Sequence, residues 1–115
     1  MSYMLLIVEE PGQRTERTQE EGEHVFQRML DYSGTLERKG VLVASNSLRS
    51  EASRLKRRDG KFNLIDGPFA ETKELVGGFF LLNVKSYEEA LECARQCPAA
   101  EWATIEIRGV GPCYT

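Results

Sequence analysis

The chain has 115 residues, a length typical of one domain, and its 41% hydrophobic and 29% charged residues exclude collagen-like, mucin-like and wholly disordered proteins. Fifteen Lys and Arg against eighteen Asp and Glu give a net charge of −3, which argues against a nucleic-acid-binding protein. The longest apolar run, residues 4–8, is far shorter than the roughly 20 residues of a membrane span, so we expect no contact with a membrane. No signal-peptide pattern begins the chain. We therefore expect one cytoplasmic domain over residues 1–115.

The first two predicted elements are a strand over residues 3–9 and an amphipathic helix. Alternate positions on both faces of the strand are apolar, which is typical of a strand covered on both sides. Thr18 and Glu21 have the spacing of a capping box, and an apolar stripe at Val25, Met29, Tyr32 and Leu36 follows. The sequence therefore predicts a helix that begins after Thr18 and ends near Gly40.

The middle of the chain predicts three strands. A short apolar strand covers residues 41–45, and residues 53–66 form a β-hairpin whose turn is Asp59-Gly60. Gly67-Pro68 interrupts regular structure. The most hydrophobic strand covers residues 75–85, and Gly77-Gly78 within it indicates a bulge or a close approach of another backbone.

A second helix begins after Ser86 and ends before Pro98, and a last strand covers residues 102–110. The order is strand, helix, strand, hairpin, strand, helix, strand. Right-handed crossovers place both helices on one face of one antiparallel sheet. The fold class is therefore α+β, a ferredoxin-like sandwich with an inserted β-hairpin.

The second face of this sheet needs a cover, because two of its strands are apolar on both faces. A bare apolar face of several hundred Å² is unusual for a monomer. We expect a second copy of the chain to stack on it, sheet against sheet, in a homodimer. The alternative is that the hairpin and the C-terminal tail fold over that face.

Residues 66–74 read DGPFAETKE and are followed by LVGGFF. This segment resembles the signature of the DGPF proteins, a branch of the YCII-related family. Further matches are MLLI near the start, GVLVASNSLRS at residues 40–50, RDG before the motif and IEIRGV near the end. The resemblance covers nearly the whole chain.

The resemblance implies a dimeric α+β barrel, in which two ferredoxin-like sheets pack face to face. Most similar proteins have no known function, and some are linked to extracytoplasmic-function sigma factors. The wider family suggests a histidine–aspartate pair that acts on small metabolites. The position of that histidine is Met29 in this chain, and the lone histidine, His24, lies about one turn earlier.

Asp66 and His24 are the candidate catalytic residues. Asp66 precedes Gly-Pro at the end of a strand, where its carboxylate can hold the bend or act as a general base. His24 lies on the first helix beside a polar stretch and can titrate near neutral pH, although a solvated or packed histidine is the alternative.

The candidate ligand-binding residues are Arg49, Phe69, Glu71 and Lys73. Arg49 follows the second strand, and its guanidinium suits a ligand carboxylate or Glu71. Phe69 is either a packed anchor or a stacking surface. Glu71 and Lys73 lie on a loop at a strand end, where sites are common, but they also fit a solvated loop.

No metal or cofactor is expected. Cys93 and Cys97 lie four residues apart on a helix, but no further Cys-His pair completes a zinc site, and an odd number of thiols suits a reducing compartment.

The favoured function is binding of a small metabolite in a cleft lined by the DGPFAETKE loop. The alternatives are an enzyme of proton transfer or hydrolysis, with Asp66 or Glu71 as base, and a regulatory module associated with sigma-factor signalling.

Overall fold

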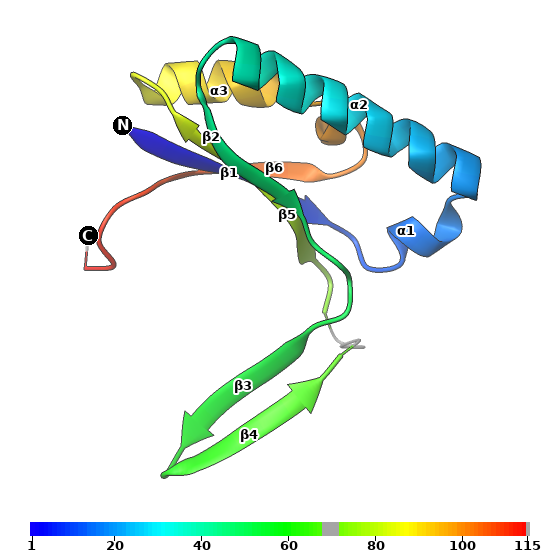
Figure 1. Cartoon of the computed structure of the whole chain (residues 1–115). Helices are drawn as coiled ribbons and strands as arrows, with labels where there is room; N and C mark the ends of the chain where they lie inside the picture. The colour runs from blue at the N-terminus through cyan, green and yellow to red at the C-terminus, as the bar shows by residue number, and fades with distance from the viewer. Residues whose placement is uncertain (68–71, 115) are drawn as a thin grey trace.

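Four antiparallel strands form one sheet in the order β2-β5-β1-β6. They are β1 (Ser2–Glu9), β2 (Leu42–Ser47), β5 (Leu75–Asn83) and β6 (Thr104–Gly109). Helices α2 (Gln19–Arg38) and α3 (Tyr87–Arg95) both lie on one face of this sheet (Figure 1). The computed structural model describes residues 1–67 and 72–114, and in it the predicted ferredoxin-like α+β fold is confirmed.

The helix ends follow the predicted capping chemistry. Thr18 Oγ1 accepts from the N–H of Glu21 at 3.1 Å, and the Glu21 carboxylate accepts from the N–H of Thr18 at 3.1 Å. At α3, Ser86 Oγ accepts from the N–H of Glu89, but the Glu89 carboxylate accepts from the N–H of Lys85 instead of Ser86. The helix η1 (Pro98–Glu101) begins at the proline that was predicted to end α3.

The core lies between the two helices and the sheet. Leu5, Leu36 and Leu82 are fully buried, one each from β1, α2 and β5. The Tyr32 hydroxyl donates to the backbone oxygen of Cys93 at 2.6 Å, which joins α2 to α3. Burial raises the pKa of the Cys97 thiol to about 11, so this sulfur acts as an uncharged packing group.

The paired glycines of β5 have the two roles that the sequence indicated. The register between β1 and β5 shifts between Ile7 and Val8, which leaves Gly77 as the extra residue of a bulge. A Cβ on Gly78 would lie 3.0 Å from the backbone oxygen of Asn46, so β2 approaches β5 closely there. Both glycines therefore occupy places where a side chain is costly.

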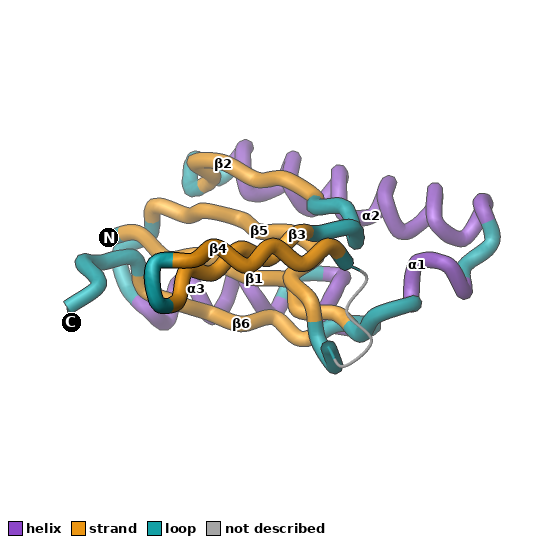
Figure 2. The backbone as a smooth tube through the Cα atoms, turned by 90° about the horizontal axis from the view of Figure 1, so that it is seen from below, coloured by secondary structure: helices purple, strands orange, loops and turns teal. Residues whose placement is uncertain are grey.

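The inserted hairpin consists of β3 (Ser53–Arg58) and β4 (Lys61–Asp66), and it forms a sheet of its own. Asp59 and Gly60 have φ angles of 53° and 74°, the left-handed conformations of the predicted two-residue turn. The hairpin extends away from the main sheet on the side opposite the helices (Figures 1 and 2). It contributes to a radius of gyration of 16.1 Å, against about 13 Å for a compact chain of this length.

The outer face of the main sheet is apolar, as predicted. Leu6 of β1 pairs with Phe79 of β5, and Met4 pairs with Leu81, and all four side chains are half-buried. The hairpin does not pack on them, because its Leu55, at 62% exposure, is mostly open to solvent. Among the described residues the alternative of a cover supplied by the hairpin therefore fails, whereas the second copy stays a prediction.

Several elements differ from the sequence prediction, among them helix α1 and the end of strand β2. The four-residue helix α1 (Gln13–Glu16) was not predicted, because one turn of helix is too short to show a periodic pattern. Gly12, with φ of 88°, turns the chain into it. Strand β2 also extends to Ser47 instead of ending at Ser45. Within residues 1–67 and 72–114, no helix is long and apolar enough to cross a membrane.

Candidate functional site

A cavity of about 490 Å³ lies between α2 and the sheet, within the range of small-molecule sites. The N-terminal part of α2 forms one wall, with positions three or four residues apart facing the space. These α2 residues are Gly22, Val25, Phe26, Met29, Leu30 and Ser33. Farther along the same helix, Tyr32 and Leu36 are buried in the core, so the helix packs tightly at one end and leaves space at the other.

The sheet beneath the cavity contributes several small residues beside larger ones such as Ile7 and Phe80. Ser45 pairs with Phe80, and Ser47 pairs with Gly78, on the side that faces the helices. Hydroxyls and missing side chains leave room there that leucine or isoleucine would fill. The volume of the cavity therefore follows from the serines of β2 and the glycines of β5.

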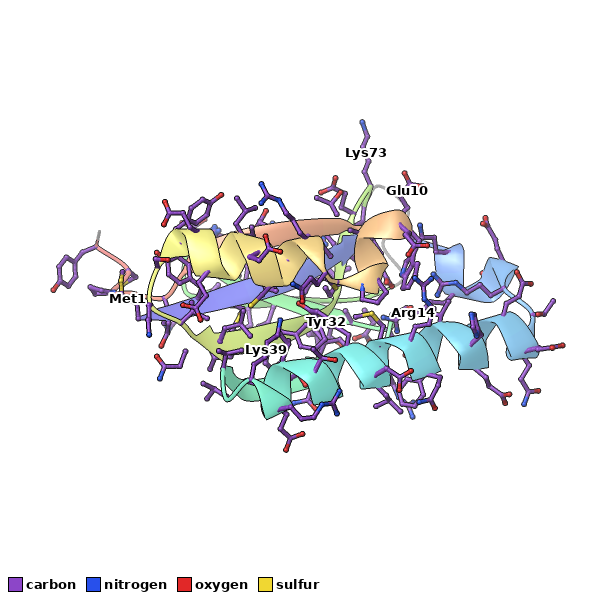
Figure 3. All side chains as sticks on the ribbon, turned by 90° about the horizontal axis from the view of Figure 1, so that it is seen from above. Met1, Glu10, Arg14, Tyr32, Lys39 and Lys73 are labelled. Carbon is purple, nitrogen blue, oxygen red and sulfur yellow. The ribbon has the colours of Figure 1, made fainter. Side chains whose placement is uncertain are left out.

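The floor of the cavity contains an ion pair between a buried carboxylate and a partly exposed arginine. Glu9 at the end of β1 is 6% exposed, and Arg14 Nε lies 2.8 Å from its carboxylate. Arg14 also donates through Nη2 to the backbone oxygen of Gly77 at 2.9 Å, and through Nη1 to the backbone oxygen of Leu48. Figure 3 shows Arg14 at the end of the molecule where α1 lies. A buried carboxylate with such partners is held in one geometry.

The bulged Gly77 makes this ion pair possible. A Cβ at this position would lie 2.5 Å from Glu9 Oε2 and 2.8 Å from Arg14 Nη2. No side chain fits without displacing one of the two charged groups. The Gly-Gly pair of β5 therefore serves the site as well as the sheet.

Helix α1 and the residue after it bring a second arginine to the cavity. Gln13 Nε2 donates to the backbone oxygen of Trp102 at 2.6 Å, which fixes α1 against the segment before β6. The Arg17 guanidinium then lies 5.6 Å from the centre of the Trp102 ring, within cation–π distance. Arg28 lies 5.5 Å from the same ring and pairs with Glu101. Arg17 and Trp102 line the cavity.

The described part of the cavity wall carries a net positive charge. Arg14, Arg17 and Glu9 are its charged residues, which sum to +1, whereas the whole chain carries −3. Glu9 is matched by Arg14. Among the described residues, no carboxylate lies within ion-pair distance of Arg17, and the carboxylate of nearby Glu21 is used by the cap of α2. Glu21 interacts electrostatically with Arg17 from outside the cavity wall, so within the wall itself Arg17 supplies the charge that Glu9 does not balance.

The residues predicted from the motif lie elsewhere. Asp66 is exposed and accepts a hydrogen bond from Ser53 Oγ at 2.6 Å, so it joins the two strands at the base of the hairpin. Lys73 is exposed and points away from the molecule (Figure 3). Arg49 lines a second cavity of about 500 Å³, on which Thr72 and Glu74 of the motif also border. Phe69 and Glu71 lie outside the described residues.

The remaining candidate, His24, is exposed on α2 and lines neither cavity. Arg54 of β3 donates to Thr72 Oγ1 at 3.2 Å. No cluster of three or more His, Cys, Asp or Glu that suits a metal ion occurs within residues 1–67 and 72–114. The structure therefore gathers its charged and aromatic groups around Glu9 and Trp102, away from Asp66 and His24.

The sequence analysis missed Glu9, Arg14, Arg17 and Trp102, although one of them carried a signal. Tyr3, Leu5, Ile7 and Glu9 occupy the same face of β1 by strict alternation, so Glu9 is an acid on a core-facing position. Buried carboxylates need a partner, which makes such a position a candidate site. Arg14 and Arg17 carried no comparable signal, because the turn at Gly12 and helix α1 decide where they lie.

The fold and the cavity together define a ferredoxin-like α+β protein with a site between its longest helix and its sheet. The profile of the YCII-related domain matches residues 1–113. The chain is 32% identical over 112 residues to an uncharacterised protein of Rhizobium meliloti (strain 1021), covering 94% of this chain and 90% of the relative. The protein therefore belongs to the YCII-related family, which confirms that part of the sequence resemblance.

A solved structure with a similar fold is 5-chloro-2-hydroxyhydroquinone dehydrochlorinase from Burkholderia phenoliruptrix AC1100, in complex with 2,5-dihydroxybenzoquinone. The TM-score is 0.56 and the sequence identity 15%, and the match covers 96% of this chain and 94% of the other. At this identity the likeness concerns the fold.

We predict that Gly77→Ala destabilises the protein by about 1–3 kcal/mol, because the added methyl group displaces Glu9 or Arg14. The matched control is Gly109→Ala in β6, where the nearest atom to a Cβ is a Tyr3 ring carbon at an ordinary 3.7 Å. We expect that control to change the free energy of unfolding by less than about 0.5 kcal/mol. Chemical denaturation measures both, and equal effects would show that the bulge does not constrain the site.

Proposed function

We propose that the protein is a homodimer that binds a small metabolite in the cavity between α2 and the sheet. The observation that carries the binding site is the cavity itself, which combines an apolar wall with a few fixed polar groups. This composition is typical of small-molecule sites. The motif loop was expected to form one wall, and its described residues border the second cavity instead.

The apolar surfaces outside the core support the proposal that a second copy of the chain completes a homodimer. The outer sheet face carries Leu6 and Phe79, and one face of the hairpin carries Leu55, Phe62 and Leu64, which are 62%, 68% and 62% exposed. A two-stranded hairpin is only marginally stable by itself in water. A partner that fills the angle between the sheet and the hairpin would remove both apolar surfaces from water.

We predict a mass of about twice the 13.0 kDa chain in light scattering at micromolar concentration. Leu6→Glu places a charge on the outer sheet face and is expected to give the monomer mass. The control is Tyr87→Glu, which alters a 47%-exposed aromatic residue on the helix side and leaves the dimer intact. A monomeric native protein would refute the assembly without affecting the cavity.

Variants of Gly22 test whether the ligand binds in the cavity. Gly22 lies on α2 and lines the cavity, and a Cβ there meets nothing within 4 Å. We predict that Gly22→Ala raises stability by up to about 1 kcal/mol through helix propensity and leaves ligand binding unchanged. Gly22→Leu fills space and is expected to weaken binding at least about tenfold.

The measurement is a melting-shift screen of small metabolites, beginning with 2,5-dihydroxybenzoquinone, since a ligand that binds the native state raises the melting temperature. Hits are then titrated against both Gly22 variants. A hit that both variants bind equally well would place the ligand outside the cavity between α2 and the sheet.

The second candidate function is an enzyme of acid–base chemistry, favoured by the burial of Glu9 in the cavity wall. One carboxylate oxygen, Oε1, is paired with Arg14, which leaves Oε2 to accept a proton from a bound molecule. Sequence analysis gave this role to Asp66 or Glu71. Asp66 is exposed at the hairpin base, and Glu71 lies outside the described residues.

We predict that, if the protein is such an enzyme, Glu9→Gln lowers its turnover at least about a hundredfold, the usual contribution of a general base. Glu10→Gln is the control, because Glu10 is the exposed neighbour. Chloride release from 5-chloro-2-hydroxyhydroquinone is the first assay. Turnover that is equal in both variants would remove Glu9 from the reaction.

A further inference from the structure

We propose that the ligand of this cavity is an aromatic monoanion whose negative group binds the Arg17 guanidinium and whose ring stacks in the aromatic part of the wall. The inference rests on the proposed function, because it names the chemical class that the same cavity accepts. Three observations carry it: the charge of the wall, the state of its two arginines and its aromatic and polar lining.

The charge balance of the wall leaves one positive charge, which favours an anionic ligand. Glu9 and Arg14 cancel, which leaves the charge of Arg17. A cationic guanidinium facing a partly closed cavity of low polarity is costly unless an anion or water accompanies it. A carboxylate or phenolate on the ligand would supply the matching charge with two-pronged geometry.

The two arginines are not equivalent. All three nitrogens of the Arg14 guanidinium bind protein oxygens, those of Glu9, Leu48 and Gly77. Arg14 therefore uses three of its five N–H groups on the protein and has its charge matched by Glu9. The Arg17 guanidinium lies 5.6 Å from the centre of the Trp102 ring, and this cation–π contact uses none of its N–H groups, which stay available for an acceptor.

The rest of the wall suits a flat ring. Trp102 and Phe26 border the same space as Arg17, together with the polarizable side chain of Met29. On the sheet side, Ser45 and Ser47 provide hydroxyl groups within the cavity lining. Such hydroxyls can bind a phenol or carbonyl substituent on the ring. The serines would then bind one part of the ligand, and Arg17 would bind its negative group.

The chain contains a direct reporter for this proposal. Trp102 is its only tryptophan, and it lines the cavity next to Arg17. The intrinsic fluorescence of the protein therefore responds to a ring bound at this place. Benzoate and benzamide are the probes, since they have nearly the same shape and differ in charge.

We expect the native protein to bind benzoate at least about tenfold more tightly than benzamide, as measured by titration of Trp102 fluorescence. Arg17→Gln is expected to remove this preference by weakening benzoate and not benzamide. The matched control is Arg28→Gln, because Arg28 contacts the same ring, carries the same charge and is not among the lining residues. Arg28→Gln should keep the preference for benzoate.

Equal affinity for benzoate and benzamide in the native protein would overturn the proposal and leave the metabolite site standing. An equal loss in the Arg17 and Arg28 variants would also overturn it, because the effect would then come from general charge. Should Arg17→Gln not fold, the comparison of the two probes on the native protein decides. Failure of every metabolite to raise the melting temperature would instead refute the proposed function.

Discussion

The rest of the site depends on the three contacts that the Arg14 guanidinium makes with the ends of neighbouring strands. One guanidinium binds the end of β1 through Glu9, the bulge of β5 through Gly77 and the residue after β2 through Leu48. A buried carboxylate is costly without a partner, and the bulge leaves just enough space for that partner. The ion pair thus joins three strand ends, fixes α1 behind them and defines the floor of the cavity.

Uneven packing of α2 explains why a cavity exists above that floor. Toward its C-terminal end the helix buries Tyr32 and Leu36 against the sheet, whereas its N-terminal part faces a stretch of sheet that includes serines and glycines. Because the helix is rigid and its C-terminal part is already packed on the sheet, its N-terminal part cannot move closer to fill the space above the small residues. The same glycines admit Arg14, so the volume and the electrostatics of the site have one origin in β5.

In the described part of the chain, the surfaces divide into a helix side with a cavity and an apolar side that no other segment covers. The sheet presents Leu6 and Phe79 outward, and the hairpin presents Leu55 and Leu64 without packing on them. Family membership and the likeness to a solved structure agree on the fold of this chain. The wall of the cavity carries a net positive charge although the chain carries −3, and this difference is the reason for proposing an anionic ligand.

The sequence by itself determined the elements and their order, because periodicity, capping residues and turn residues act over a few neighbouring positions. It predicted the Thr18 cap, the Asp59-Gly60 turn and the bulge near Gly77, and the motif identified the family. Only the tertiary structure decided which charged residues meet. Asp66 and His24 were conspicuous along the chain yet lie exposed, whereas Arg14 and Arg17 reach the cavity through a four-residue helix that has no periodic signal. Contacts between distant segments depend on the packing of the whole sheet, and local patterns carry no information about them.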